Sequence, residues 1–201
     1  MASRSRTDTA TTAATTAAGT TTTEPKTRKR GRGAASVSEA AEAVEVNCLM
    51  NARYHSGREA FLDATHRWFM FCVVAAGAGA VTGVLDTIPY SQALLGCIAA
   101  LLGAADLAFD LSNRAKSHAL MKRRYFELLA DMREGRKTPA DVEACSHRYS
   151  ADEEPAFHAL LMSAWNAAQC MVYGNDAQKA HIPRHHRWLQ NVWRFEGRTY
   201  Q

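Results

Sequence analysis

Two carboxylates interrupt an otherwise apolar part of this sequence. Asp106 and Asp110 lie near the end of the apolar segment Ala93–Leu111. A carboxylate among apolar residues costs free energy unless it is paired or meets water. The position of Asp106 is therefore consistent with a functional charge or with a structural hydrogen bond, for instance to Cys72 or a bound water. For Asp110 the structural interpretation, an ion pair at the end of the segment, is favoured.

Other residues that could do chemistry do not form a recognised motif. His181, His185 and His186 lie close together, but no nearby cysteine or carboxylate completes a tetrahedral metal site. The sequence has no phosphate-binding loop, dinucleotide fingerprint or nucleophile elbow. None of the five cysteines forms a CxxC pair, a pattern typical of a reducing compartment. We therefore predict no catalytic residues, no metal, no cofactor and no enzyme activity.

Two apolar segments must position the carboxylates. Trp68–Leu85 contains no charged residue and, at 1.5 Å per residue, spans roughly 27 Å, close to the hydrocarbon thickness of a bilayer. The second segment is Ala93–Leu111. The short connector Asp86–Gln92, with Pro89 in it, requires the two helices to be antiparallel. A soluble bundle with two buried helices is the competing interpretation.

The placement of basic residues favours the membrane and predicts the topology. The connector has no lysine or arginine, whereas both outer flanks are basic, with Arg53, Arg58 and Arg67 on one side and Arg114, Lys116, Lys122, Arg123 and Arg124 on the other. The positive-inside rule then places both termini in the cytoplasm. We predict a multi-pass protein of the cell inner membrane, with the lipid bilayer as its first partner.

Small residues collect on one face of each apolar segment. The first segment contains the GxxxG pair Gly79 and Gly83, and the second has Gly96 and Gly103 on the face of Asp106. Small faces let helix backbones approach closely, while large residues suit lipid. The four glycines are therefore predicted at helix–helix contacts, within the hairpin or between copies in a homo-oligomer.

The predicted turn also fixes which residues lie opposite one another. A midpoint between Ile88 and Pro89 places Arg67 opposite Asp110 and Asp63 opposite Arg114, giving two crossed ion pairs. On the same register Asp106 lies one turn deeper, level with Phe71. The sequence thus predicts paired charges at the rim and one deep carboxylate.

The whole chain divides into three parts: 1–35, 36–135 and 136–201. The first is a Thr- and Ala-rich basic tail, predicted to be disordered, whose excess of basic residues accounts for the net charge of +4, so the charge indicates no specific nucleic acid. The second holds the hairpin and its helical extensions, which form a stalk from a capping box at Ser36 and Glu39 to a C′ glycine at Gly135.

The third part is predicted to be helical. A helix begins at Thr138–Pro139, and another follows Asp152–Pro155 with an apolar stripe that includes Leu160, Ala164 and Ala168. The last stretch, His185–Phe195, places Trp188, Leu189 and Val192 on one side and arginines on or beside the other. That stretch could lie at the level of lipid headgroups or pack against the other helices.

The layout resembles that of a known family. Asn51–Phe71 (NARYHSGREAFLDATHRWFMF), the two short apolar segments and Leu101–Met132, followed by a helical tail, are similar to the SLATT proteins, which are SMODS- and SLOG-associating two-transmembrane effectors. The resemblance covers about residues 40 to 195. It implies a membrane effector of bacterial conflict systems, triggered by a separate cytoplasmic sensor or nucleotide-signalling partner, with no catalytic residues to transfer.

The fold expected from sequence is an all-α membrane protein: an antiparallel two-transmembrane hairpin with a helical cytoplasmic stalk and C-terminal helices. Its expected function is to oligomerise and perturb or permeabilise the membrane in bacterial defence. The alternative is a membrane anchor or scaffold that recruits a cytoplasmic partner, which the long stalk fits equally well.

Overall fold

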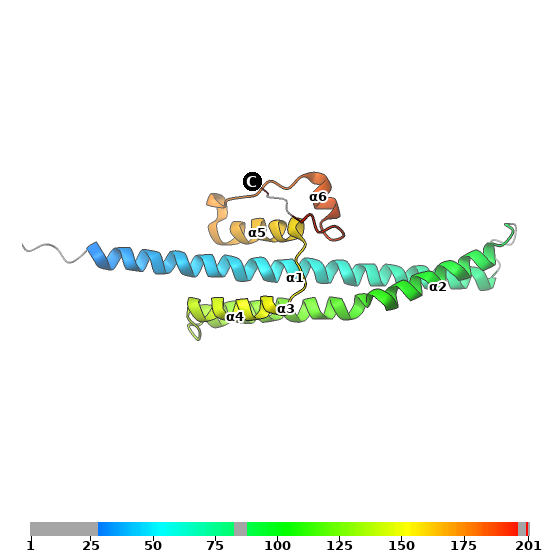
Figure 1. The fold of residues 1–201 in the computed structure, drawn as a ribbon, viewed down its shortest axis with the longest axis horizontal. Helices are drawn as coiled ribbons and strands as arrows, with labels where there is room; N and C mark the ends of the chain where they lie inside the picture. Colours follow the sequence, from blue (N-terminus) through cyan, green and yellow to red (C-terminus); the bar gives the residue numbers. More distant parts are fainter. Residues whose placement is uncertain (1–27, 83–87, 197–199, 201) are drawn as a thin grey trace, which may run out of the picture.

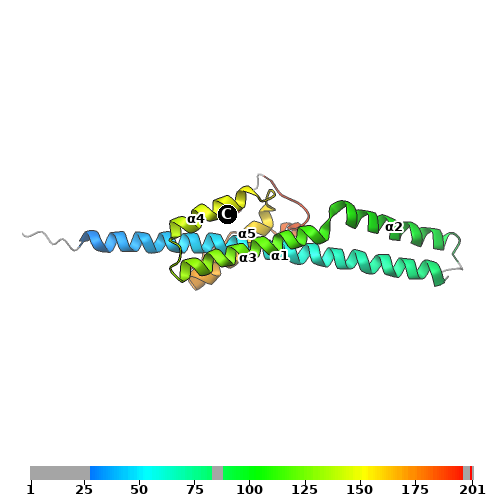
Figure 2. The ribbon, with the colours of Figure 1, turned by 90° about the horizontal axis from the view of Figure 1, so that it is seen from below.

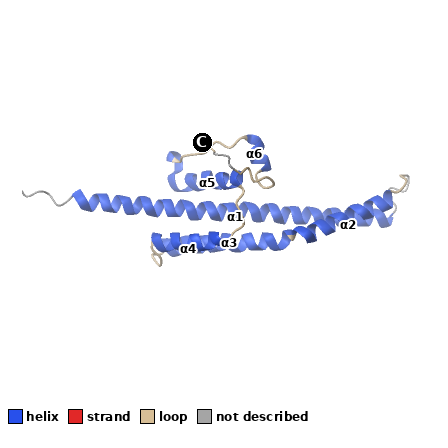
Figure 3. Ribbon diagram, viewed as in Figure 1, coloured by secondary structure: helices blue, strands red, loops and turns tan. Residues whose placement is uncertain are grey.

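The computed structural model describes residues 28–82, 88–196 and 200, and every regular element within these ranges is a helix (Figure 3). The longest is α1, Arg28–Thr82, whose 55 residues extend about 80 Å at 1.5 Å per residue. The helices α2 to α5 lie along it (Figure 1). The fold is therefore all-α, as predicted, with one long helix as its axis.

The start of α1 differs from the prediction. The helix begins at Arg28, so Ser36 lies inside it and cannot act as an N-cap with Glu39. The nearest proline is Pro25, and the residues between it and Ser36 include lysine, arginine and alanine, which favour helix. Most of the predicted disordered tail, residues 1–27, lies outside the described residues.

The second arm consists of α2, Ser91–Phe109, and α3, Leu111–Arg133. The sequence predicted one continuous helix here, which is wrong at Asp110: this residue adopts a left-handed conformation with φ 48° and ψ 47°, and the arm changes direction there (Figure 2). Aspartate tolerates this conformation better than most residues. The Nδ2 of Asn113 donates to its Oδ1 at 2.9 Å, which stabilises the break.

The end of α3 and the start of α4 follow the prediction. Gly135 has a φ of +71° and its N–H donates to the Met132 carbonyl, which confirms its role after α3. The helix α4, Pro139–Ala151, begins with a capping box in which Thr138 and Asp141 exchange side chain–backbone hydrogen bonds. It is followed by α5, His158–Tyr173, by a single 3-10 turn η1, Gly174–Asp176, and by α6, Arg184–Leu189.

The core lies between α1 and the helices on its two sides. On one side α1 packs against α3 and α4 through Cys48, Ala52, Tyr125, Leu128 and Val142. On the other side the predicted stripe of α5 packs on α1, where Leu160 and Ala164 meet Tyr54. A Cβ at Gly57 would lie 3.2 Å from Cδ1 of Leu160, so the absence of a side chain permits the close approach of α5. We call the part of the molecule around these contacts the bundle.

Candidate functional site

Beyond the bundle, α2 and the last turns of α1 lie side by side as an antiparallel pair, here called the hairpin (Figures 1 and 2). Among the described residues one helical run is long and apolar enough to cross a membrane. This run, Ser91–Arg133, has a mean hydropathy of 1.9 in its most apolar stretch, and only 6% of that stretch is buried. The core helix of a soluble bundle would be mostly buried, so this helix presents its apolar surface outward.

The other predicted segment forms the end of α1. Trp68–Thr82 is helical, and the three last residues of the predicted span, Gly83–Leu85, lie outside the described residues. Large side chains point outward here too: Val81 is 87% exposed, and Trp68, Phe71 and Val74 are exposed. Both arms of the hairpin therefore have an apolar outer surface.

The contact between the two arms uses only part of the predicted small-residue faces. A Cβ at Gly79 would meet Cδ1 of Leu95 at 3.2 Å, so Gly79 lies at the predicted contact. Nothing lies within 4 Å of a Cβ at Gly96 or Gly103, so of the two contacts predicted for these residues, within the hairpin or between copies, the first is not made. Gly83 lies outside the described residues. The small residues Gly96 and Gly103 instead border an open face of α2.

One polar pair lies between the arms. Nδ1 of His66 and Oδ1 of Asp106 are 2.8 Å apart, and the Asp106 side chain is only 16% exposed. A hydrogen bond to an imidazole satisfies a carboxylate that apolar surroundings would otherwise penalise. Of the two interpretations for Asp106, the structural hydrogen bond is therefore present in this chain, with His66 rather than Cys72 as partner.

The two predicted crossed ion pairs are absent. Arg67 pairs with Asp63 one turn earlier on α1, at 2.6 Å, and Arg114 pairs with Glu154 at 2.6 Å. The carboxylate of Asp110 accepts from Asn113. Because Asp106, and not Asp110, lies opposite His66, the register differs from the predicted one by about one helical turn. A hairpin with its midpoint between Ile88 and Pro89 therefore does not describe how the two arms pair.

A second polar group is buried in the bundle, level with the start of α5. We call His55, His118, Tyr125 and Glu153 the histidine cluster. Nδ1 of His55 faces Nδ1 of His118 at 2.8 Å, so a single proton lies between the two rings. Nε2 of His55 lies 3.1 Å from Oε1 of Glu153, an ion-pair contact without good hydrogen-bond alignment, and the Tyr125 hydroxyl donates to the same oxygen at 2.8 Å.

The environment of the histidine cluster shifts its titration. Burial, together with the nearby charges of His55 and Arg58, lowers the pKa of His118 from 6.5 to about 4. Burial opposes ionisation of Glu153, yet its contacts with His55 and Tyr125 prevail and hold its pKa below the ordinary value. Burial and the bond to Glu153 raise the pKa of Tyr125. At neutral pH the cluster therefore holds a neutral His118 and an ionised Glu153, which joins the α4–α5 connection to α1 and α3.

The spacing of these histidines from apolar residues of the same helix could have predicted their burial. His55 follows Cys48 and Ala52 at helical spacing on α1, and His118 follows Leu111 and Ala115 on α3. Each histidine thus occupies a core position of an i, i+3/i+4 stripe. A polar residue in such a stripe predicts a buried partner, but the identity of that partner depends on register. Glu153 could not be found in this way because it lies between helices.

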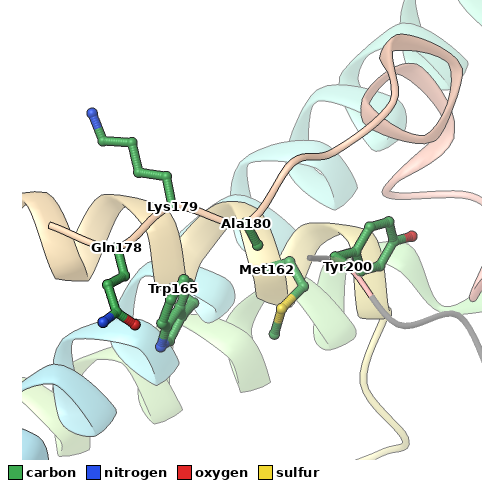
Figure 4. Close-up of a pocket in the computed structure, with 6 residues that line it drawn as sticks. All are labelled: Met162, Trp165, Gln178, Lys179, Ala180 and Tyr200. Carbon is green, nitrogen blue, oxygen red and sulfur yellow. The ribbon is translucent and has the colours of Figure 1, made fainter.

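Two cavities accompany these features. One, of about 200 Å³, borders the histidine cluster and is lined by Tyr54, Arg114, Ser117, Met121, Asp152 and Glu154 in addition to cluster residues. The other, of about 360 Å³, lies between α5 and the segment that returns over it (Figure 4). Met162 and Trp165 line it from α5, while Lys179 points away from it (Figure 4). Asn166 holds the returning segment through two hydrogen bonds with Ala180, of 2.8 and 2.7 Å.

No set of three or more metal-binding side chains converges within 28–82 and 88–196. His185 and His186 pack edge to face, with ring centroids 4.4 Å apart. Comparison with protein-family models, with curated proteins and with solved structures finds no match to this chain.

Proposed function

We propose that the chain is an integral membrane effector that oligomerises through its hairpin and perturbs or permeabilises the bilayer in a bacterial conflict or defence system. The observation that carries the proposal is the outward-facing apolar surface of α2, of which 6% is buried along its most apolar stretch. Water would penalise that surface at about 25 cal/mol per Å², whereas lipid would not. A bilayer around the hairpin supplies the missing apolar surroundings.

In this proposal both arms cross the inner membrane and both termini lie in the cytoplasm. Basic residues flank the hairpin, and the connector lacks lysine and arginine, which supports that orientation. The trigger would come from a cytoplasmic sensor or nucleotide-signalling partner, as the resemblance to SLATT proteins implies. Tyr90 is exposed at the turn and Lys179 is exposed in the bundle, so the two positions test the orientation.

In a cysteine-free background, Tyr90→Cys should react with an impermeant thiol reagent in intact cells, and Lys179→Cys should not. Labelling at residue 179 from outside would overturn the orientation. Equal labelling at both positions only after lysis would overturn the crossing of the membrane.

The oligomer is proposed to form through the open face of α2. Gly96, Ala100 and Gly103 follow one another at spacings of four and three, so they share a face, and Gly96 and Gly103 have no neighbour within 4 Å of an added Cβ. Small residues let helices of different copies approach closely in lipid. Ala100→Ile should therefore reduce crosslinking between copies and depolarisation of cells. The matched control is Ala108→Ile, because Ala108 is also exposed on α2 but lies on another face.

A membrane anchor or scaffold is the second candidate, and the His66–Asp106 pair favours it. An unpaired carboxylate in the hairpin would support a water-filled path, because carboxylates at a pore mouth attract cations. Here the carboxylate already has a partner at 2.8 Å. Asp106→Asn keeps a hydrogen-bond acceptor for His66. The variant should leave depolarisation unchanged if Asp106 is structural and reduce it if Asp106 lines a path; a wild-type chain that never depolarises cells with any partner leaves only the scaffold.

A further inference from the structure

The chain after α5 ends in a surface of exposed tryptophan and arginine side chains. Trp188 is 90% exposed, Trp193 is 65% exposed, and Leu189 and Val192 are also exposed. Arg184, Arg187 and Arg194 are exposed in the same stretch of chain, and Glu196 is the only acidic residue between 184 and 196. The sequence left two positions open for this stretch, at the lipid headgroups or packed against the other helices. In the structure these apolar side chains do not pack against the other helices.

The backbone beneath this surface is firmly held. Nη1 of Arg58 donates to the carbonyl oxygen of Asn191 at 2.7 Å, and the His158 N–H donates to the Arg194 carbonyl at 3.2 Å. The Arg58 guanidinium also lies 4.0 Å from the centre of the Phe157 ring. The indoles are therefore exposed because an ordered turn presents them, not because the chain end is loose.

The position of this surface along α1 is set by the bond between Arg58 and Asn191. Arg58 lies ten residues before Trp68, hence about 15 Å before the apolar part of the helix. The helix α6 lies at the end of the C-terminal segment nearer α2, and its axis turns away from the direction of α1 (Figure 1). Headgroups and the potential of an anionic leaflet extend outward from the hydrocarbon by distances of this order, roughly 5–8 Å and a further 8–10 Å.

We propose that this surface rests on the anionic headgroup layer of the membrane that the hairpin crosses. The inference rests on the proposed function, since it requires the hairpin to be in the bilayer. Tryptophan is favoured at the boundary between hydrocarbon and headgroups because its ring is amphipathic. The guanidinium groups of Arg184 and Arg187 pair with lipid phosphates and are attracted to acidic lipids. The surface thereby fixes the bundle against the membrane at a second point beside the hairpin.

A second copy of the chain fits this surface less well than lipid does. Two such surfaces face to face would bring together three arginines from each copy, with one glutamate each to offset them. Phosphate headgroups provide the opposite charge throughout. Charge complementarity therefore selects the lipid surface over self-association.

The test uses the full chain reconstituted in vesicles, with one tryptophan kept and the other three replaced by phenylalanine. The chain has four tryptophans, Trp68, Trp165, Trp188 and Trp193, which serve as built-in controls. Trp68 reports on the hairpin, and Trp165, in the cavity beside α5, reports on the bundle. With a spin label at the headgroup, fluorescence of Trp188 and Trp193 should be quenched several-fold more than that of Trp165. Adding Arg184→Gln and Arg187→Gln should weaken that quenching in phosphatidylglycerol vesicles and leave Trp68 unchanged.

The outcomes separate the inference from the proposed function. Quenching of Trp68 by acyl-chain labels, with Trp188 and Trp193 quenched no more than Trp165, overturns the inference and leaves the membrane hairpin standing. If Trp68 is not quenched either, the membrane hairpin itself fails. Burial of Trp188 that increases with protein-to-lipid ratio and occurs without quenching shows a second copy on this surface, which also overturns the inference.

Discussion

The bundle and the hairpin are built on the same helix, α1, yet they distribute their side chains in opposite ways. In the bundle, Tyr125, Leu128 and Val142 are almost completely buried, while charged pairs such as Arg123–Glu127 are on the outside. In the hairpin the large apolar residues are outside, with Leu107 83% exposed, and the ionisable pair His66–Asp106 lies between the arms. One protein thus has an apolar interior at one end and an apolar exterior at the other.

The two arrangements match the two solvents of the proposed function. Water favours an apolar core and a charged surface, as in the bundle. A bilayer accepts apolar side chains anywhere on the outside but requires polar groups to be paired or to face protein. The change from one arrangement to the other occurs near Trp68 on α1 and near Asp110 on the second arm, where the left-handed residue separates α2 from α3.

The largest effect is expected from an acidic residue on the outer surface of the hairpin. Leu101→Asp places a charge on α2, where insertion would cost about 2.5–3.5 kcal/mol near the middle of a membrane helix. In water the same change would be nearly neutral, because Leu101 is 65% exposed. We expect the variant to be lost from the carbonate-resistant membrane fraction. The control is Leu120→Asp on α3, also at an exposed leucine. This variant should stay in the membrane fraction; if both variants behave alike, the hairpin and the bundle do not differ in the solvent that they face.

A smaller effect is expected from the polar interior of the bundle. Tyr125→Phe removes the hydroxyl that donates to Glu153 at 2.8 Å and leaves an ionised carboxylate short of a donor. The free energy of unfolding should fall by about 1–3 kcal/mol. Denaturant unfolding of the purified protein in detergent measures this. Tyr149→Phe is the matched control, since the Tyr149 ring packs on Tyr125 without a hydroxyl bond among the described residues, and it should change stability much less.

The bundle should also lose stability in acid. Because the pKa of His118 is about 4 in the folded chain and 6.5 when unperturbed, the unfolded state binds a proton between these pH values while the folded state does not. The contribution of His118 to the free energy of unfolding should therefore be complete above pH 6.5 and should decline as the pH falls toward 4. The depressed pKa of Glu153 adds a further loss at lower pH. His118→Gln should remove the decline between pH 6.5 and 4, and His147→Gln, at an exposed histidine of α4, should keep it.

The smallest effect concerns two glycines of the hairpin. Alanine in a helix is favoured over glycine by up to about 1 kcal/mol. In a detergent that keeps the chain monomeric, Gly103→Ala should gain most of that, because nothing in the same chain lies within 4 Å of its Cβ. Gly79→Ala must displace Leu95 from 3.2 Å and should gain less. Thermal unfolding in detergent distinguishes the two. A larger gain at Gly79 would show that the arms meet on a different face.

Much of the fold follows from local sequence. The apolar periodicity predicts the helices, Thr138 and Pro139 predict the start of α4, and the stripe of Leu160 and Ala164 predicts how α5 packs. These features depend on residues one or two turns apart, so sequence contains them. The break at Asp110 is different, because aspartate only permits a left-handed residue and does not require one.

Three features follow from the sequence alone: the helical fold of the described residues, the two apolar segments and the buried face of α5. Which residues meet across the two arms depends on the tertiary packing. A helix repeats its faces about every turn, so a hairpin shifted by four residues shows nearly the same faces to its partner. The periodicity therefore could not show whether Asp110 or Asp106 lies opposite His66 and Arg67 on α1. The packing between the arms made that choice, and with it paired His66 with Asp106 and His55 with His118. Arg114 pairs with Glu154, which lies outside the two arms in the α4–α5 connection.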